Sequence, residues 1–387
     1  MNGKDYSLLV IGNFTSVYVI QLVRHLKQTN PQARIFFWGY SREKCDVDRS
    51  FLDCFEDYCL FDIKHIVHST TLWQIKAVAE LRKNFRNFAS GKYFDYISIQ
   101  YIKPEYYFLN HYFKMYSKHL VLTPWGSDVY RVNGIHRFFV KKTFEAADFL
   151  TGPDDRFTRD FTKLFHVPEN KIVHCDLGVA PIDYIIEHKH KIDGKEAKHQ
   201  LNIENNYVIT CGYNAASAHR HLEIIEAVNK VRSQLPENLL LLFPLTYHKE
   251  EKYINSIKQK VMEYGLKAIF FEEFLDIPHL FLLRQATDLF IHIQPTDASS
   301  GTLYEYILCE KKILNGSWLQ YPEIEQYGAK PYYPVESMDT LGEAIVNAVN
   351  SEPIHIDERV LTDLAKKQWK VVIKDWDKFF LANRNHE

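Results

Sequence analysis

Short apolar runs alternate with longer amphipathic segments along most of this 387-residue chain. The apolar run Leu8 to Ile11 is followed by a helical pattern, Val17 to Lys27, and by a second apolar run, Arg34 to Trp38. This alternation is typical of βαβ units, whose strands pair in parallel and whose ligands lie beyond the carboxyl ends of the strands. It predicts an α/β protein, and the chain length favours two Rossmann-like domains over one.

The character of the sequence changes near the middle of the chain. Residues 178–206 contain charged runs without a sustained apolar face, and a second βα series opens at Tyr207 to Cys211. We therefore expect an N-terminal domain over residues 1–177, a linker with a peripheral helix over 178–206, and a C-terminal domain over 207–365. The remaining segment, 366–387, contains an amphipathic, Trp-rich stretch that could cross back to the N-terminal domain.

Charge and cysteine content exclude several classes of protein. A formal net charge of −2 argues against a protein that coats nucleic acid, and no apolar run reaches the roughly 18 residues of a membrane span. The charge is uneven, because residues 1–176 hold 24 Lys and Arg against 19 Asp and Glu, whereas the rest of the chain holds 23 against 30. The six cysteines include no C-x-x-C pair, which favours free thiols in a reducing cytoplasm.

The segment from Gln294 to Lys312 has the pattern of a ligand-binding strand end. A loop of small and hydroxyl residues joins an apolar run to a helical pattern, and it consists of Ser299, Ser300, Gly301 and Thr302. Free backbone N–H groups at a helix start suit a phosphate. Asp297 and Glu305 flank this loop, and a carboxylate one turn into the helix can accept hydrogen bonds from sugar hydroxyls. An ordinary capped helix with a solvated Glu305 remains the alternative.

A second loop in the same predicted sheet concentrates donors and positive charge. It runs from Gly212 through Asn214 to His219, Arg220 and the start of a helix, and it suits a diphosphate. Its alternative is a loop whose basic residues face water. Tyr247 and Glu272 follow two other predicted strands of this domain, where either side chain could hold a base or a ribose.

Two loops of the first half lie at predicted strand ends. Gly12 and Asn13 end the first strand, but they fall short of a G-x-G-x-x-G dinucleotide fingerprint and an ordinary turn is equally consistent. The turn that contains Trp125 and Asp128 follows a later strand. Asp128 could orient or deprotonate an acceptor hydroxyl, or it could only cap the next helix.

Metal and membrane contacts have weaker signals. The D-x-D sequence Asp46-Val47-Asp48 lies among basic residues, which favours a charged surface loop over a metal site, and His188 with His190 lacks a nearby third ligand. No metal is predicted. The helical pattern Trp73 to Phe88 carries aromatic and basic residues that could contact an anionic membrane. A solvated helix face is the alternative.

Together these stretches resemble GT-B glycosyltransferases, which have two facing Rossmann-like domains around a central cleft. The run from Gly212-Tyr-Asn to Ala227 resembles the donor-phosphate loop of family 4 enzymes, with His219 or Arg220 where those usually have Lys. Asp297 to Glu305 resembles their E-x7-E segment, with Asp in the first position, and Trp125-Gly-Ser-Asp128 resembles their H-G-x-D turn. The sequences W-G-S-D-V-Y, F-P-L-T-Y and G-T-L are also similar to dTDP-4-acetamido-4,6-dideoxygalactose (Fuc4NAc) transferases.

The resemblance implies a metal-independent, hexosyltransferase-type enzyme of bacterial surface polysaccharide synthesis. It would move a sugar from a nucleotide diphosphate donor to a hydroxyl of a glycan or polyprenyl-linked glycan, without a further cofactor. Arg220 and His219 would stabilise the leaving diphosphate, Glu305 would bind the ribose, and Asp297 would contact the donor sugar. Asp128 would be the base if the reaction inverts.

Several points stay open at this stage. The expected location is the cytoplasm, with peripheral contact on the inner face of the cell membrane as an open alternative. The sugar, base, acceptor and stereochemistry are not specified by the sequence. Trp125 in place of the usual His keeps a non-catalytic scaffold subunit as an alternative, and a GT-B sugar epimerase is another.

Overall fold

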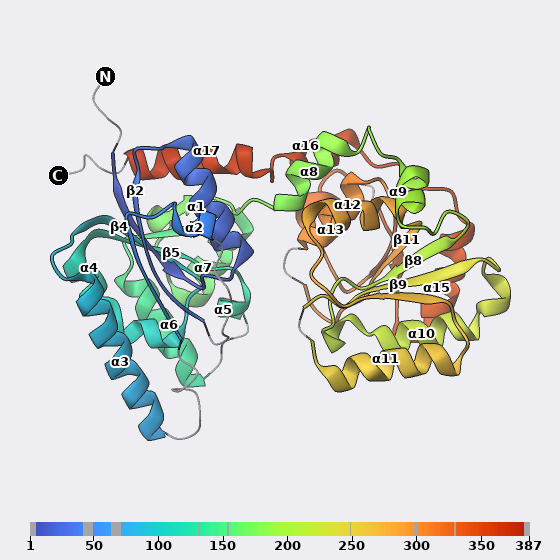
Figure 1. Cartoon of the computed structure of the whole chain (residues 1–387), viewed down its shortest axis with the longest axis horizontal. Coiled ribbons are helices and arrows are strands. Elements are labelled where there is room, and N and C mark those ends of the chain that lie inside the picture. Colours follow the sequence, from blue (N-terminus) through green and yellow to red (C-terminus); the bar gives the residue numbers. More distant parts are fainter. Residues whose placement is uncertain are drawn as a thin grey trace. The chain divides into compact units, whose positions relative to one another are not determined.

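The chain folds into two compact units in a computed structural model (Figure 1). Unit 1 comprises Met1–Gly178 with Lys367–Glu387, and unit 2 comprises Val179–Lys366. The structure describes residues 5–41, 49–62, 71–130, 132, 134–152, 155–247, 249–297, 300–328 and 330–382.

Among the described residues, unit 1 contains a seven-stranded parallel sheet in the order β3-β2-β1-β4-β5-β6-β7. Its strands are β1 (Ser7–Gly12), β2 (Arg34–Ser41), β3 (Asp57–Asp62), β4 (Phe94–Gln100), β5 (Ser117–Thr123), β6 (Phe149–Gly152) and β7 (Ile172–His174). The strand order reverses between β1 and β4, which pair with Val10 opposite Ser98. The parallel sheet predicted from the alternating pattern is confirmed.

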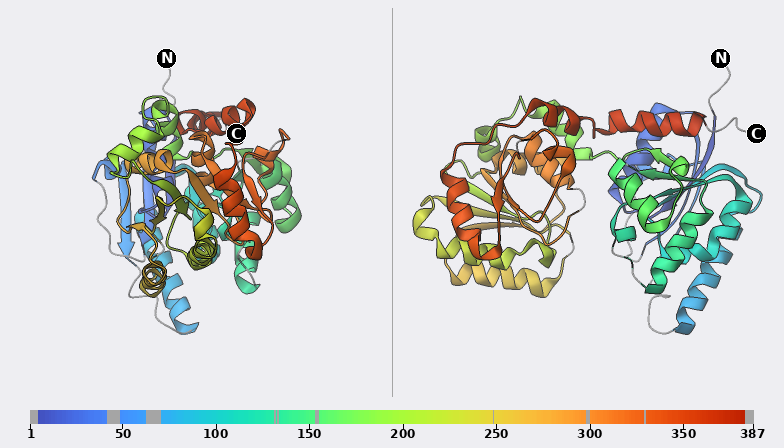
Figure 2. Two further views of the ribbon diagram at one scale, coloured as in Figure 1. Left: turned by 90° about the vertical axis from the view of Figure 1, so that its right-hand side faces the viewer. Right: turned by 180° about the vertical axis from the view of Figure 1, so that it is seen from behind.

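Helices cover both faces of this sheet, with α3, α4 and α6 on one face and α1 and α17 on the other (Figures 1 and 2). The helices of unit 1 are α1 (Val17–Thr29), α2 (Arg49–Leu52), α3 (Thr71–Ala89), η2 (Pro104–Leu109), α4 (Asn110–Tyr116), α5 (Ser127–Tyr130), α6 (Gly134–Ala146), α7 (Asp155–Phe165), η3 (Glu169–Lys171) and α17 (Trp369–Ala382). The labels η mark 3-10 helices.

The last helix, α17, packs in unit 1 against α1 and the adjoining sheet face. The Tyr96 hydroxyl donates to the Phe380 carbonyl at 3.0 Å, and the Trp376 Nε1–H donates to the Asp176 carbonyl at 2.7 Å. Lys367 forms an ion pair with Asp176 at 2.6 Å. Burial of the aromatic side chains of α17 explains why the end of the chain returns to unit 1.

Unit 2 repeats the architecture, and its described residues form a six-stranded parallel sheet in the order β10-β9-β8-β11-β12-β13. Its strands are β8 (Tyr207–Cys211), β9 (Leu239–Pro244), β10 (Ala268–Phe271), β11 (Leu289–His292), β12 (Lys312–Gly316) and β13 (Tyr333–Val335). Its helices are α8 (Ala180–His188), α9 (Gly194–Gln200), η4 (Ser217–His219), α10 (His221–Lys230), η5 (Arg232–Gln234), α11 (Glu251–Glu263), α12 (Ile277–Ala286), α13 (Gly301–Leu308), α14 (Pro322–Glu325), η6 (Met338–Thr340), α15 (Leu341–Asn350) and α16 (Glu358–Ala365).

Residues 179–206, interpreted from the sequence as a linker, form part of unit 2 instead. Ile182, Ile185 and Ala197 of α8 and α9 are fully buried in the core of this unit. The sequence did not indicate that these helices belong to a core. Their few core side chains are separated by charged residues. The chain crosses between the units near Gly178 and again near Lys367.

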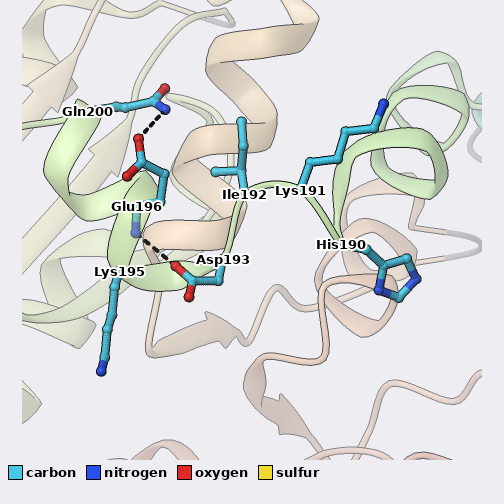
Figure 3. Close-up of a pocket in the computed structure, with 7 residues that line it drawn as sticks. All are labelled: His190, Lys191, Ile192, Asp193, Lys195, Glu196 and Gln200. Carbon is cyan, nitrogen blue, oxygen red and sulfur yellow. Dashed lines mark hydrogen bonds between the residues drawn. The ribbon is translucent and has the colours of Figure 1, made fainter.

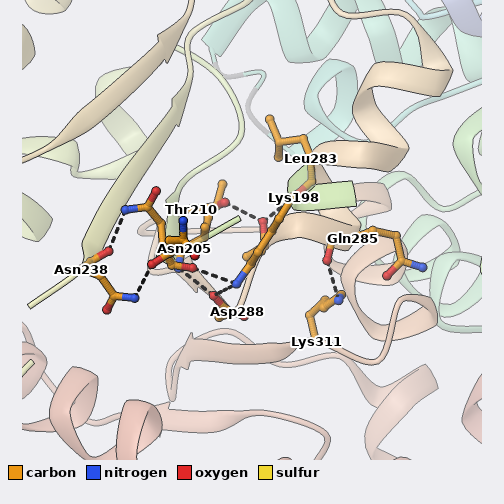
Figure 4. A network of polar contacts seen from close by, with 11 residues as sticks. Lys198, Asn205, Thr210, Asn238, Leu283, Gln285, Asp288 and Lys311 are labelled. Carbon is orange, nitrogen blue, oxygen red and sulfur yellow. Dashed lines mark hydrogen bonds and ion pairs between the residues drawn. The ribbon is translucent and has the colours of Figure 1, made fainter. Parts of the chain in front are cut away.

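A network of polar contacts ties α9 to the amino-terminal ends of β8 and β11 (Figure 4). Asp288 Oδ2 accepts hydrogen bonds from the Val208 N–H at 2.7 Å and from Lys198 Nζ at 2.6 Å. Lys198 also donates to the Asn206 carbonyl at 2.9 Å. One carboxylate therefore joins a helix to the two central strands of the sheet.

We expect Asp288→Ala to lower the free energy of unfolding of unit 2 by about 1–3 kcal/mol, because the Val208 N–H and Lys198 lose their shared acceptor. Urea unfolding followed by circular dichroism measures this change. Glu310→Ala is the matched control, since Glu310 pairs with Lys189 but is 60% exposed and should contribute below about 1 kcal/mol. A cost for Asp288→Ala no larger than that of Glu310→Ala would contradict the anchoring role.

No helix among the described residues is long and apolar enough to cross a membrane.

Candidate functional site

The candidate donor site of unit 2 lies where the strand order reverses, between β8 and β11. The loops that follow these two strands diverge at the carboxyl edge of the sheet and leave a crevice in proteins of this class. The loop from Gly212 to His221 follows β8, and the segment that contains Gln294 and Asp297 follows β11. Gln294 Nε2 donates to the Tyr213 hydroxyl at 3.5 Å, so the two loops are in contact.

The loop after β8 requires glycine at its first position. Gly212 has a φ of +64°, and a β-carbon there would lie 2.8 Å from the β-carbon of His219 and 3.0 Å from Nε2 of His221. Asn214 is buried, and its Oδ1 accepts the Ala216 N–H at 2.8 Å. These contacts hold the loop in a single turn close to the sheet.

The basic residues of this loop face different surroundings. His219 is buried with its ring against Tyr213, at a centroid distance of 4.2 Å. Burial lowers the pKa of His221 to about 4, so that ring is neutral near pH 7. Arg220 is half-buried with a φ of +55°, and its guanidinium lies 5.6 Å from the ring centroid of Trp318. Arg220 brings a permanent positive charge to the strand edge.

Asp297 belongs to a cluster with His292 and Tyr321. The Tyr321 hydroxyl donates to Asp297 Oδ2 at 3.0 Å, and His292 Nε2 lies 3.3 Å from the same oxygen. His292 is fully buried at the end of β11. Burial opposes ionisation of Asp297, but the contacts with His292 and Tyr321 outweigh it and lower the pKa of this carboxyl. Asp297 is thus a fixed carboxylate at the edge of the sheet.

Helix α13 begins at the second candidate phosphate position. Ser300 is its N-cap, and Ser300 Oγ accepts the Leu303 N–H at 3.2 Å. Thr302 is half-buried in the first turn, and Gly301 lies next to Val179, which would be 3.3 Å from a β-carbon at that position. Ser299 lies outside the described residues.

Glu305 is buried on α13 and forms an ion pair with Arg284 of α12. Glu305 Oε2 and Arg284 Nε lie 2.9 Å apart, and Arg284 Nη1 donates to the Tyr306 hydroxyl at 3.4 Å. The arginine is 3% exposed and the glutamate 5%. Burial raises the pKa of Glu305, and the charge of Arg284 opposes that shift. The solvated face that the sequence left open for Glu305 is therefore excluded by the structure.

The two remaining donor candidates follow the neighbouring strands β9 and β10. Tyr247 follows β9. Burial raises the pKa of its hydroxyl, Asn214 and Arg284 oppose this shift, and the charge of Glu305 adds to it. The Tyr247 side chain therefore lies near Asn214, Arg284 and Glu305. Glu272 instead follows the outermost strand, β10, and pairs with Lys258 at 2.6 Å.

Unit 1 has its own cavity, of about 510 Å³, at the carboxyl ends of its strands. Asn13, Tyr40, Lys103, Glu105 and Asp128 are among the residues that line it. The Tyr40 hydroxyl donates to Glu105 at 2.5 Å, and Lys103 Nζ lies 3.7 Å from the centroid of the Tyr40 ring. Asn13 accepts two hydrogen bonds from Thr15, which closes the first loop.

Asp128 connects two loops of this cavity. Its oxygens accept the Ile102 N–H at 2.7 Å and the Trp125 N–H at 2.9 Å. Burial raises its pKa to about 6, although these hydrogen bonds oppose the shift. Gly12 is buried beside Gln100, and the Trp125 ring packs edge-on against Tyr18 and Tyr101.

A larger depression, of about 620 Å³, is lined by the segment that joins α8 to α9 and by α9 itself (Figure 3). Its acidic residues are engaged locally, since Asp193 accepts the Glu196 N–H and Glu196 accepts Gln200 Nε2. His190 lies apart from both carboxylates. His188, considered with His190 as a metal pair, stacks on Tyr184 and contacts the Tyr184 carbonyl.

Metal ligands do not gather elsewhere within the described ranges, which contain no group of three or more His, Cys, Asp or Glu suited to an ion. Asp46 and Asp48 lie outside these ranges.

Sequence reasoning missed Arg284, Trp318 and Tyr321 in unit 2, and Tyr40 and Lys103 in unit 1. None of them belongs to a local motif that the sequence analysis could recognise. His292 did carry a signal, since it is a polar residue near the end of an apolar run.

No protein-family model matches the sequence, and no curated protein matches it. Its fold is similar to that of a UDP-forming α,α-trehalose-phosphate synthase from Burkholderia xenovorans, with a TM-score of 0.69, 11% identity, and coverage of 98% of this chain and 99% of that one. A glycosyltransferase from Rickettsia africae matches with a TM-score of 0.67, 12% identity and coverage of 99% and 100%.

Anabaena HepE, solved with UDP and glucose, matches with a TM-score of 0.59, 13% identity and coverage of 97% of each chain. These likenesses confirm the GT-B fold of two parallel α/β domains that the sequence predicted.

Proposed function

We propose that this chain is a glycosyltransferase that moves a sugar from a nucleotide diphosphate donor to a hydroxyl acceptor. The observation that carries the proposal is that Arg220 and Asp297 lie on the loops that follow β8 and β11, the two strands between which the strand order of unit 2 reverses. A GT-B fold, and solved structures of this fold that hold UDP and glucose, support the same reading.

In this proposal the residues of unit 2 bind and polarise the donor. The guanidinium of Arg220 and the backbone N–H groups at the start of α13 meet the diphosphate and stabilise the negative charge that develops as it leaves. Asp297, held by His292 and Tyr321, contacts the donor sugar. Glu305 accepts hydrogen bonds from the ribose, and Arg284 orients its carboxylate.

The acceptor is assigned to the cavity of unit 1. Its hydroxyl would meet Asp128, whose pKa of about 6 suits a general base near neutral pH if the reaction inverts configuration. We propose a glycan or polyprenyl-linked glycan of bacterial surface polysaccharide synthesis as the acceptor, following the resemblance to family 4 and Fuc4NAc transferases.

A donor screen tests this proposal. We expect one class of nucleotide sugar to raise the melting temperature, and free nucleotide to be released faster when a hydroxyl acceptor is present. Conversion of the donor sugar without an acceptor would indicate an epimerase. Stabilisation by a donor without turnover would indicate a scaffold subunit, and an absence of any response to nucleotide sugars would overturn the proposal.

We expect activity to persist in EDTA, because Arg220 and the start of α13 supply the positive charge that a metal would otherwise bring to the diphosphate. Turnover measured with and without the chelator checks this. Abolition of turnover, with recovery on addition of Mg²⁺ or Mn²⁺, would point to a metal site, for which Asp46 and Asp48 are the candidates to mutate.

A further inference from the structure

Unit 1 has an exposed surface where aromatic and basic side chains from several elements meet. The 3-10 helix η2 packs against α3, α4 and α6, and these helices lie on the same face of the sheet (Figures 1 and 2). We call this the basic aromatic surface and define it by Arg82, Lys83, Arg86, Phe108, Ile135, Arg137 and Phe138. The catalytic proposal above uses none of these side chains.

The apolar part of this surface is at the start of α6. Ile135 is 63% exposed and Phe138 is 48% exposed, and they stand one helical turn apart. The Phe138 ring lies 5.7 Å from that of Phe139, which in turn lies 5.0 Å from Phe108 of η2. Large exposed side chains that continue into an aromatic cluster mark a binding surface more often than isolated ones do.

Cations flank these apolar side chains. Arg82 and Arg86 are exposed on α3, and Arg82 Nε donates to the Phe108 carbonyl at 2.8 Å. The Arg82 guanidinium lies 5.9 Å from the Phe108 ring, and that of Arg86 lies 5.6 Å from Tyr112. Together α3, η2, α4 and α6 contain eight Lys and Arg against three Glu. One of these, Glu145, pairs with Lys142.

We propose that unit 1 docks on an anionic lipid bilayer through the basic aromatic surface. Isoleucine and phenylalanine side chains enter the boundary between head groups and acyl chains, while long basic side chains extend to the phosphates. A polyanion in solution would match the cations, but it would leave Ile135 and Phe138 exposed to water. A bilayer therefore accounts for both the basic side chains and the exposed apolar ones.

The surface also adjoins the acceptor cavity. Pro104 and Glu105 at the start of η2 line that cavity, and Phe108 of the same element belongs to the surface. Docking would hold the cavity next to a lipid-linked acceptor. This last step rests on the proposed function, whereas docking itself holds whether or not the chain transfers a sugar.

Co-sedimentation of the full chain with vesicles tests the proposal without any assay of activity. We expect binding to vesicles that contain phosphatidylglycerol, little binding to pure phosphatidylcholine, and weaker binding as salt rises. Lys83→Glu and Arg137→Glu should each reduce partitioning by about fivefold or more. Lys83 is exposed on α3 and Arg137 on α6. Lys252→Glu, at an exposed position on α11 of unit 2, is the matched charge control.

The apolar contribution is tested separately by Ile135→Ser combined with Phe138→Ser. Both residues are exposed, so the variant should keep the melting temperature while losing vesicle binding. Phe274→Ser is the control, because Phe274 of unit 2 is 78% exposed. This variant should leave vesicle binding unchanged. Equal binding to neutral and anionic vesicles, equal loss in the controls, or binding to heparin without binding to vesicles would each overturn the proposal.

Discussion

Glu305→Ala is expected to destabilise unit 2 by about 3–5 kcal/mol, because it leaves the guanidinium of Arg284 buried without its partner. The loss should appear as a large drop in the melting temperature and in the urea midpoint. An unchanged unfolding midpoint would contradict the buried ion pair. Weak nucleotide binding by this variant alone would not identify a ribose contact, since a loosened α12 and α13 would also weaken it.

A double variant separates the two roles of Glu305. Arg284→Met combined with Glu305→Leu replaces both charges with apolar side chains of similar size, and such replacements of buried pairs are often close to neutral for stability. If Glu305 binds the ribose, this folded variant should still lose donor affinity by about tenfold or more, as measured by calorimetry. Donor affinity equal to that of the native chain would remove the ribose assignment while leaving the structural role intact.

Arg220→Ala is expected to lower kcat by about 10²–10³-fold, because the leaving diphosphate loses a preorganised cation. The fold should survive, since Arg and Ala both carry a β-carbon and the left-handed backbone at this position costs the same with either. Steady-state kinetics with a saturating donor measures the effect. Arg220→Lys should recover part of the activity, because it restores the charge without the planar guanidinium.

A control for Arg220 is available in the same unit. Arg232 is exposed in η5 and donates to the Tyr264 carbonyl at the far end of α11, so Arg232→Ala removes an equal charge away from the strand edge. Its kcat should stay within about twofold of the native value. A similar loss of kcat in both variants would mean that net charge alone, and not the position of Arg220, governs the rate.

The alternating pattern was sufficient to predict two parallel α/β units, because every strand–helix pair carries its own periodicity in the sequence. It missed the edge strands β3 and β13.

The sequence did not predict that α8 and α9 belong to unit 2. Their few apolar residues pack in a core that is formed by other elements of the unit. Local sequence did indicate the loop at Gly212, from its small residues after an apolar run, and it placed Asp297 and Arg220 at strand ends. Both inferences use only residues that are close together in the sequence.

By itself, the sequence determined the parallel α/β architecture and the strand ends that carry the candidate site, because both follow from periodicity and turn chemistry within about 20 residues. Only the tertiary structure decided what each side chain meets. It paired Glu305 with Arg284, joined Asp297 to His292 and Tyr321, and turned His219 inward. Such contacts join separate elements, so they exist only after the sheet has brought those elements together.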